Sequence, residues 1–523
     1  MARYAYDRLS AQDASFLWAE SPHEPMHVGA VAVLEAGPLR NEEGGIDIAR
    51  YRQAVEAVLH WIPRYRQVIA WTPLEGWPIW VDDRHFDLAY HIRHISLPRP
   101  GTQEQLKEIA SRILARPLDR ERPLWEIWVL EGLEGGEQFG LLNKVHHCMI
   151  DGAAGVDLAQ ILMSPKPDRE VEEPVPYLAR PAPGSLELLR DTVRHRLAQP
   201  LELLGKARQA LADPRKSLDE LGRRARALGN LVEYVRQPAS ETPINGELSP
   251  HRRFDWLTMP LDDLLELRTV LGCTVNDIVL ATVAGAMRRY LFRRRVDLGA
   301  IDFRVATPVS TRRDEHDRRQ GNHVSTWIVR LPVAETDPLA RVRAIREQTG
   351  EFKRKESALA LETLMAVAEY MPPGLIAPGI SLAKAPINMV VTNVPGPSFT
   401  LYQLGAPLLG MYPMVPLLPG SGLGVAIFRY EDKLCWGLNA DYELLPDIQT
   451  LTDDVRTSLE ELRAAAVHAY LEQRTAVEPA PMLEQEAPTV EEAPKRKTRK
   501  KARSSSRDRP SGQVSQASVR AGG

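Results

Sequence analysis

Hydrophobic and polar residues follow two different spacings in the first part of the chain. Apolar positions recur every three or four residues from Ile48 to Leu59 and from Gln103 to Leu114, which is the spacing of an amphipathic helix. Trp125–Leu130 and Phe139–His147 are short runs of aromatic, branched and apolar residues separated by a Glu-Gly-Gly segment. We therefore predict two helices and a β-hairpin, and an α/β domain over residues 1–163.

The rest of the chain divides where the composition changes. Residues 164–249 begin rich in proline and charge and continue with helical patterns, which predicts a linker and an amphipathic helical crossover. A second α/β domain is predicted over residues 250–471. Its uncharged run, Ala385–Phe428, holds seven prolines and six glycines, so we expect buried strands and turns there and no membrane-spanning helix. Residues 472–523 are predicted to be a disordered tail, acidic and then basic.

The predicted crossover allows two interpretations. Residues 185–236 carry eleven Lys/Arg against seven acidic residues, and their apolar positions recur at helical spacing. Such helices either lie on the two domains or touch a membrane or lipid droplet surface through a basic amphipathic face. The sequence leaves both interpretations open.

Charge and cysteine content exclude several classes of protein. The 523 residues include 66 Lys/Arg and 69 Asp/Glu, a formal charge of −3, which excludes a surface that is basic throughout and binds nucleic acid. Ten of the basic residues follow Pro494, so the end of the tail is basic while the preceding chain is acidic. Three separated cysteines exclude a disulfide framework. The first residues lack the apolar core of a secretory signal, so we expect a cytoplasmic protein.

The segment HHCMIDG, which follows the predicted hairpin, carries the candidate chemistry. If the strand continues to His147, the ring of His147 lies on the same face as the apolar side chains of Phe139 and Val145. Such apolar surroundings keep the pKa of an imidazole near or below neutrality. Such a ring can accept a proton. The alternatives are a metal site, which adjacent strand residues on opposite faces do not favour, and a structural core histidine. Cys148 lacks an orienting base and is expected to be structural.

HHxxxDG resembles the active-site motif of acyltransferases of the chloramphenicol acetyltransferase type and of peptide synthetase condensation domains. Further segments narrow the resemblance to the bacterial wax ester synthase/diacylglycerol acyltransferase family, and they occur in the family's order. They are LSAQDASFLWAE with PMHVG, PLWE at Pro123–Glu126, TVNDIVLA at Thr274–Ala281, PVSTR at Pro308–Arg312, GNHVS at Gly321–Ser325 and TNVPGP at Thr392–Pro397.

The resemblance implies two chloramphenicol acetyltransferase-like α/β domains in one chain, and roles for specific residues. His147 is the general base and His146 a supporting residue, while Asp151 holds the loop through a buried ion pair. Gly152, Asn276 and Asp277 are the expected substrate-binding residues. Asp277 also fits a helix-capping pattern with Thr274, which is compatible with lining the active site. TNVPGP has turn chemistry, and we expect a tight turn that brings the second domain against the first.

The implied activity is transfer of a long-chain acyl group from acyl-CoA to diacylglycerol or a long-chain alcohol. Acyl-CoA is then a co-substrate, and no other cofactor and no metal is expected. The alternatives are a condensation-type enzyme that uses a carrier-protein thioester and a non-catalytic relative that binds lipid droplets. We expect no specific nucleic acid partner. Peripheral contact with an anionic membrane face or with droplets fits the basic segments, and the sequence does not disclose an oligomeric state.

Overall fold

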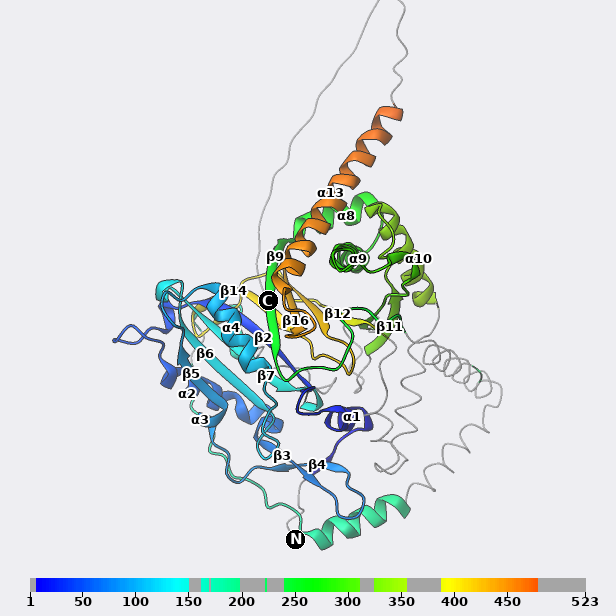
Figure 1. The fold of residues 1–523 in the computed structure, drawn as a ribbon. Helices are drawn as coiled ribbons and strands as arrows, with labels where there is room; N and C mark the ends of the chain where they lie inside the picture. The colour runs from blue at the N-terminus through cyan, green and yellow to red at the C-terminus, as the bar shows by residue number, and fades with distance from the viewer. Residues whose placement is uncertain are drawn as a thin grey trace, which may run out of the picture. The chain divides into compact units, whose positions relative to one another are not determined.

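The computed structural model describes residues 6–149, 161–168, 171–197, 222, 239–310, 324–354 and 387–477 (Figure 1). Residues Met1–Glu472 group into one compact unit, and Gln473–Gly523 form a second. All helices and strands of the described residues begin within the first unit.

A seven-stranded sheet is built mostly from the first half of the chain. Its strand order is β5–β6–β7–β2–β14–β13–β8. β5 and β6 pair in parallel, and the other neighbours are antiparallel. The predicted hairpin is confirmed as β6 and β7. The strands are β2 His27–Glu35, β5 Ile92–Ser96, β6 Trp125–Leu133, β7 Gln138–His146, β8 Met163–Ser164, β13 Tyr402–Gln403 and β14 Ala406–Met414.

A six-stranded sheet belongs to the second half, in the order β11–β10–β12–β15–β16–β9. Its central pairs β10–β12 and β12–β15 are parallel, and the other pairs are antiparallel. The predicted uncharged run supplies β12, β13, β14 and most of β15, and its first two residues lie outside the described residues. The strands are β9 Arg252–Pro260, β10 Arg304–Ser310, β11 Val324–Arg330, β12 Met389–Val394, β15 Leu423–Tyr430 and β16 Lys433–Asp441.

A small third sheet supports the beginning of the crossover. It consists of β1 (Asp7–Arg8), β4 (Pro78–Asp82) and β3 (Gln67–Trp71), in that order. Residues 185–197 form a helix that packs Leu188 against the apolar side chains of β4. The remainder of the predicted crossover helices, to Arg236, lies outside the described residues except for position 222.

The helices form where periodicity and capping residues coincide. The two predicted amphipathic helices are confirmed as α2 and α4. Asp47 caps α2, and Thr102 and Gln105 form a capping box at the start of α4. The helices are α1 Ala11–Ala19, α2 Ile48–Val58, α3 Leu88–His91, α4 Gln103–Leu114, α8 Leu261–Leu271, α9 Val275–Arg293, α10 Pro338–Arg354 and α13 Ile448–Val477.

Apolar side chains cover both faces of the seven-stranded sheet. On β7, Phe139 and Leu141 pack in one cluster with Val55 of α2. Leu142 points to the other face and packs with Leu106 of α4. This alternation agrees with the period of two predicted for the strand. Helices α2 and α4 therefore lie on opposite faces, and in the second half α8, α9, α10 and α13 share one core with the six-stranded sheet.

The segment TNVPGP carries the chain from one sheet to the other. β12 ends at Val394 in the six-stranded sheet, and the next strands, β13 and β14, belong to the seven-stranded sheet, where β14 pairs with β2. The turn passes very close to β15, because a Cβ atom at Gly396 would lie 2.0 Å from the carbonyl oxygen of Arg429. The predicted turn between the two halves is therefore present, and it requires glycine.

The predicted α/β fold class is confirmed by these mixed layers of sheet and helix. The domain boundaries at residues 163, 249 and 471 stay predictions. Among the described residues, no single helix is long and apolar enough to cross a membrane. Helices α8 and α9, which meet at a sharp bend, reach that length and apolar character only when the two are taken together.

Candidate active site

His147 lies immediately beyond the seven-stranded sheet. β7 ends at His146, which pairs with the first residue of β2, and His147–Met149 form a 3₁₀ turn. The backbone N–H of His147 donates to the carbonyl oxygen of Met26 at 2.8 Å. The prediction that His147 continues the strand is therefore wrong, because the chain turns where the ladder with β2 ends.

The ring of His147 is held against a helix. It stacks on Phe16 of α1, with ring centroids 3.8 Å apart and an angle of 17° between the planes. Protein atoms surround most of His147, yet part of its surface stays accessible. Burial lowers the pKa of His147 to about 4. The backbone carbonyl of His147 opposes this shift, and the nearby His146 lowers the pKa further. The direction of this shift is the one predicted for a ring that accepts a proton at neutral pH.

His146 connects the turn to a carboxylate. Its side chain is fully buried, and its Nδ1 accepts a hydrogen bond from the backbone N–H of Cys148 at 3.2 Å. Its Nε2 lies 3.4 Å from Oε1 of Glu20. A ring nitrogen that accepts a hydrogen bond carries no proton, so we assign the proton of His146 to Nε2, which faces Glu20 without forming a hydrogen bond.

Glu20 is a buried, ionised carboxylate at the end of α1. Its Oε2 accepts from Nε and Nη2 of Arg120 at 2.9 and 2.7 Å, and its Oε1 accepts from the backbone N–H of Met26 at 3.1 Å. Burial alone would raise the pKa of Glu20, but the nearby His146 and the hydrogen bonds and charge of Arg120 outweigh burial and lower the pKa to about 2. Glu20 is therefore an anion at neutral pH.

Three of these residues were not predicted from the sequence. Phe16 and Glu20 belong to LSAQDASFLWAE, and their spacing of four residues places both on one side of α1. That spacing is the signal that could have suggested a joint role. Arg120 lies 100 residues from Glu20 along the chain, and no local pattern marks it as a partner.

Cys148 is structural by its environment, as expected. The side chain is buried, and burial, followed by the charges of Asp13 and Glu20, raises the pKa of the thiol well above its ordinary value. The thiolate, which is the nucleophilic form, is therefore disfavoured.

Asp277 has a clear structural role at the start of α9. Its Oδ2 accepts from the backbone N–H and the hydroxyl of Thr274, and its Oδ1 accepts from the hydroxyl of Thr349 on α10. Both carboxylate oxygens are thus engaged in protein contacts. Asn276 is partly exposed. Whether Asn276 and Asp277 also bind substrate stays a prediction.

The remaining predicted site residues, Asp151 and Gly152, lie outside the described residues. Their roles stay predictions. Within the part of the chain that the structure describes, no group of three or more His, Cys, Asp or Glu side chains is arranged to hold a metal ion.

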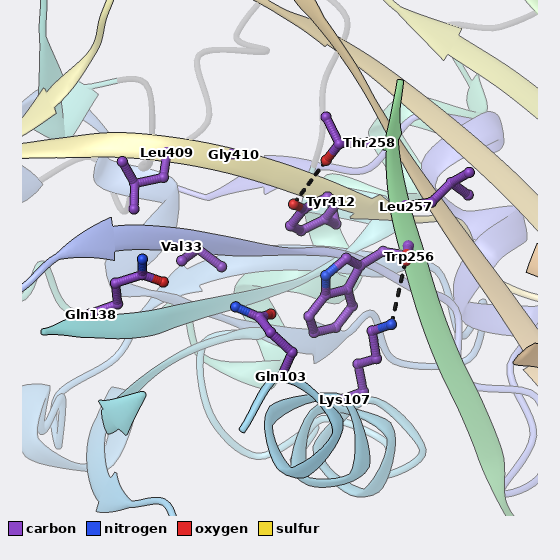
Figure 2. Close-up of a pocket in the computed structure, with 10 residues that line it drawn as sticks. All are labelled: Val33, Gln103, Lys107, Gln138, Trp256, Leu257, Thr258, Leu409, Gly410 and Tyr412. Atoms are coloured by element: carbon purple, nitrogen blue, oxygen red, sulfur yellow. Dashed lines mark hydrogen bonds between the residues drawn. The ribbon is translucent and has the colours of Figure 1, made fainter. Parts of the chain in front are cut away.

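A pocket of about 330 Å³ is lined by residues of β2, α4, β7, β9 and β14 (Figure 2). Its lining includes Gln138, the first residue of β7, together with Lys107 of α4, Trp256 of β9 and Tyr412 of β14. Nζ of Lys107 lies 2.5 Å from Oδ1 of Asp255. The lining extends from the register of Gln138 to that of Tyr412, which lies across Val31 from Leu142, so it ends five strand residues, or roughly 17 Å, before His147. The pocket is therefore separate from the predicted base.

Comparisons with known sequences agree on one family. Residues 9–279 match the wax ester synthase/diacylglycerol acyltransferase catalytic domain, and residues 320–463 match the C-terminal domain of the same family. A putative diacylglycerol O-acyltransferase of Mycobacterium tuberculosis is 32% identical over 471 residues, which cover 88% of this chain and 90% of the relative. A probable diacylglycerol O-acyltransferase of the same species is 31% identical, and the match covers 88% of this chain and 96% of the relative.

Solved structures show the same similarity. The wax ester synthase/diacylglycerol acyltransferase of Marinobacter aquaeolei aligns with a TM-score of 0.61 and 27% identity, over 88% of this chain and 99% of that one. The first condensation domain of the calcium-dependent antibiotic synthetase aligns with a TM-score of 0.54 and 17% identity, over 88% and 97% of the two chains. The second similarity concerns the fold alone, and it agrees with the predicted pair of chloramphenicol acetyltransferase-like domains.

Proposed function

Because the chain belongs to the wax ester synthase/diacylglycerol acyltransferase family and is an acyltransferase, we propose that it uses acyl-CoA as donor and His147 as general base. The acceptor is the hydroxyl group of diacylglycerol or of a long-chain alcohol. The observation that carries this proposal is the state of His147. Its ring is neutral, fixed by Phe16 and partly accessible.

The chemistry needs one ring nitrogen with a free lone pair. Nδ1 of His147 is buried without a hydrogen-bond partner in the described part of the chain, so we propose that Nδ1 carries the proton and that Nε2 faces the substrate. Nε2 then takes the proton of the acceptor hydroxyl as its oxygen attacks the thioester carbonyl. When the tetrahedral intermediate collapses, the ester forms and the C–S bond breaks, and the imidazolium returns the proton to the CoA sulfur. The proposed mechanism requires no acyl-enzyme, no metal and no further cofactor.

We also propose a peripheral location at a cytoplasmic membrane face or a lipid droplet. In the helix of residues 185–197, Leu186, Val193 and Leu197 are 82%, 50% and 71% exposed. Their spacings of seven and four residues place them on one stripe of the helix, opposite the buried Leu188. Arg190 and Arg194 are exposed beside this stripe. Apolar side chains with flanking positive charge suit insertion into an anionic lipid surface.

The deciding experiment is an assay of the full-length protein with palmitoyl-CoA. Hexadecanol and diacylglycerol are offered in parallel, and release of free CoA thiol is followed together with the lipid product. We expect thiol release that depends on the acceptor. A protein that is inactive with acyl-CoA but active with a carrier-protein thioester would contradict the proposed donor, and a protein inactive with both would contradict a catalytic role.

A further inference from the structure

We propose that Glu20 is a positioning residue for His147. Its carboxylate fixes the turn that carries His147 through two separate connections, one through His146 and one through the backbone of Met26. This inference rests on the proposed function, because it assumes that His147 is the general base. Glu20 acts on His147 through other residues and is not itself a catalytic residue.

The first connection ends on the residue after His147. Oε1 of Glu20 lies 3.4 Å from Nε2 of His146, and Nδ1 of His146 accepts from the backbone N–H of Cys148 at 3.2 Å. The ring of His146 is fully buried, and its Nε2 faces Glu20 without forming a hydrogen bond, so this connection is a close electrostatic contact. The position of Glu20 is thus transmitted to the backbone of Cys148.

The second connection ends on His147 itself. Oε1 of Glu20 accepts from the backbone N–H of Met26 at 3.1 Å, and the carbonyl oxygen of Met26 accepts from the backbone N–H of His147 at 2.8 Å. The two connections therefore reach consecutive backbone N–H groups, those of His147 and Cys148. A backbone held at two adjacent points leaves the side chain of His147 little freedom to shift.

The same helix also fixes the plane of the His147 ring. Phe16, which stacks on that ring, lies one turn before Glu20 on α1. Arg120 secures this end of the helix, because its guanidinium donates both to Glu20 and to the carbonyl oxygen of Leu17 at 2.8 Å. The side chain of Glu20 is 5% exposed, whereas that of Arg120 is 41% exposed. Without Glu20, Arg120 could return to water, but the backbone N–H of Met26 would lose its acceptor and the buried ring of His146 would lose the carboxylate beside it.

A displaced base is expected to slow the chemical step more than substrate binding. A misplacement of about 1 Å at a reacting group can cost on the order of a hundredfold in rate. We therefore expect Glu20→Ala to lower kcat by about 10- to 100-fold, with KM for palmitoyl-CoA and for the acceptor nearly unchanged. A purely structural role would reduce the fraction of folded protein and leave kcat per folded molecule as it is.

Two conservative variants separate position from charge. Glu20→Gln keeps an oxygen at the same reach, which can accept from Met26 beside His146, but it removes the charge and turns an amide NH2 group toward Arg120, which is free to move into water. Glu20→Asp keeps the charge but is one methylene shorter. Positioning predicts that Glu20→Gln recovers most of the parent kcat and that Glu20→Asp does not. The opposite order would overturn the proposal.

Glu75 offers a matched control for the loss of a buried carboxylate. Its side chain is 6% exposed and pairs with Arg8 and Arg196. Glu75→Ala should therefore lower the melting temperature while kcat stays near that of the parent. All variants are compared as full-length proteins, with kcat normalised to the folded fraction measured by circular dichroism.

The outcomes distinguish this inference from the function on which it rests. If the parent releases no thiol, or if folded His147→Ala keeps its activity, the proposed function fails. If the parent is active and His147→Ala is inactive, parent-like kcat in Glu20→Ala overturns the positioning role alone. A raised KM with unchanged kcat in Glu20→Ala would also overturn it, because that result would indicate lost substrate binding.

Discussion

His147 is the residue on which the proposed chemistry depends. Its neutral ring can take a proton from a hydroxyl, and a positioned general base typically contributes about 10²–10⁴ in rate. We expect His147→Ala to lower kcat/KM by at least about a hundredfold while the fold stays intact. The measurement is thiol release from the purified variant, with circular dichroism as the control for folding. Near-parent turnover by a folded His147→Ala protein would remove His147 from the mechanism.

The lowered pKa of His147 predicts an unusual tolerance of acid. Only the neutral ring acts as a base, and burial lowers the pKa to about 4, so the active fraction changes little between pH 7 and pH 5. We expect kcat/KM to stay nearly flat over that range and to fall as the pH approaches 4. A decline centred near 6.5, the ordinary pKa of histidine, would contradict this environment for His147.

The pH profile needs a control for unfolding, since the same shift affects stability. The unfolded chain has an ordinary His147 pKa and binds more protons than the folded chain between pH 6.5 and 4. The contribution of His147 to stability is therefore full above about pH 6.5 and is lost as the pH falls through the folded pKa near 4. Activity that recovers after return to pH 7 separates protonation of the base from irreversible unfolding.

At the residue scale, the sequence identified the parts of the site that are contiguous. HHCMIDG places His146, His147 and Asp151 within one short segment, so residue types and spacing were enough to predict the base. The environment of His147 was not predictable in the same way. Arg120 reaches Glu20 across 100 residues, and such a contact depends on how α1 and the chain before β6 come together in three dimensions.

At the scale of elements, periodicity predicted the helices better than the sheets. α2, α4 and α9 follow apolar spacing and begin at capping residues, which are local signals. β14 is also apolar, but its pairing with β2 joins residues that are more than 370 positions apart, and no local pattern specifies that register. Membership of a strand in one sheet or the other is therefore a result of tertiary packing.

Gly396, in the turn between β12 and β13, is expected to tolerate no larger residue. A Cβ atom at position 396 would lie 2.0 Å from the carbonyl oxygen of Arg429 and 2.5 Å from the ring of Phe428. Gly396→Ala must therefore displace backbone, and overpacking of this kind typically costs about 1–3 kcal/mol. We expect a clearly lower melting temperature by differential scanning fluorimetry.

A control for Gly396→Ala is available at the surface. A Cβ atom at Gly37 would meet no atom within 4 Å. Gly37→Ala should melt within about a degree of the parent, because most surface substitutions stay within about ±0.5 kcal/mol. Equal melting temperatures for Gly396→Ala and the parent would show that the turn adjusts more freely than its contacts with β15 suggest.

At the scale of the whole molecule, charge and apolar exposure are unevenly distributed. The chain carries a formal charge of −3, yet ten of its Lys and Arg residues lie between Lys495 and the end. The exposed stripe of Leu186, Val193 and Leu197 lies elsewhere, on the helix of residues 185–197. These two segments offer different attractions to an anionic lipid surface. Charge attraction contributes about 1 kcal/mol per Lys or Arg near such a surface and weakens with salt, whereas apolar insertion does not.

This difference predicts how two variants should bind liposomes. Deletion of residues 475–523 should reduce flotation with anionic liposomes at low salt and have little effect at high salt, because it removes charge. The triple variant Leu186→Ser, Val193→Ser and Leu197→Ser should reduce binding at every salt concentration, because it removes the side chains that insert. Phe292→Ser is the control, since Phe292 is 69% exposed but lies on α9, in neither of the two segments. Both variants should keep the parent rate on detergent-solubilised substrate. Binding that is absent in the parent, or identical in all four proteins across the salt series, would contradict the proposed peripheral location.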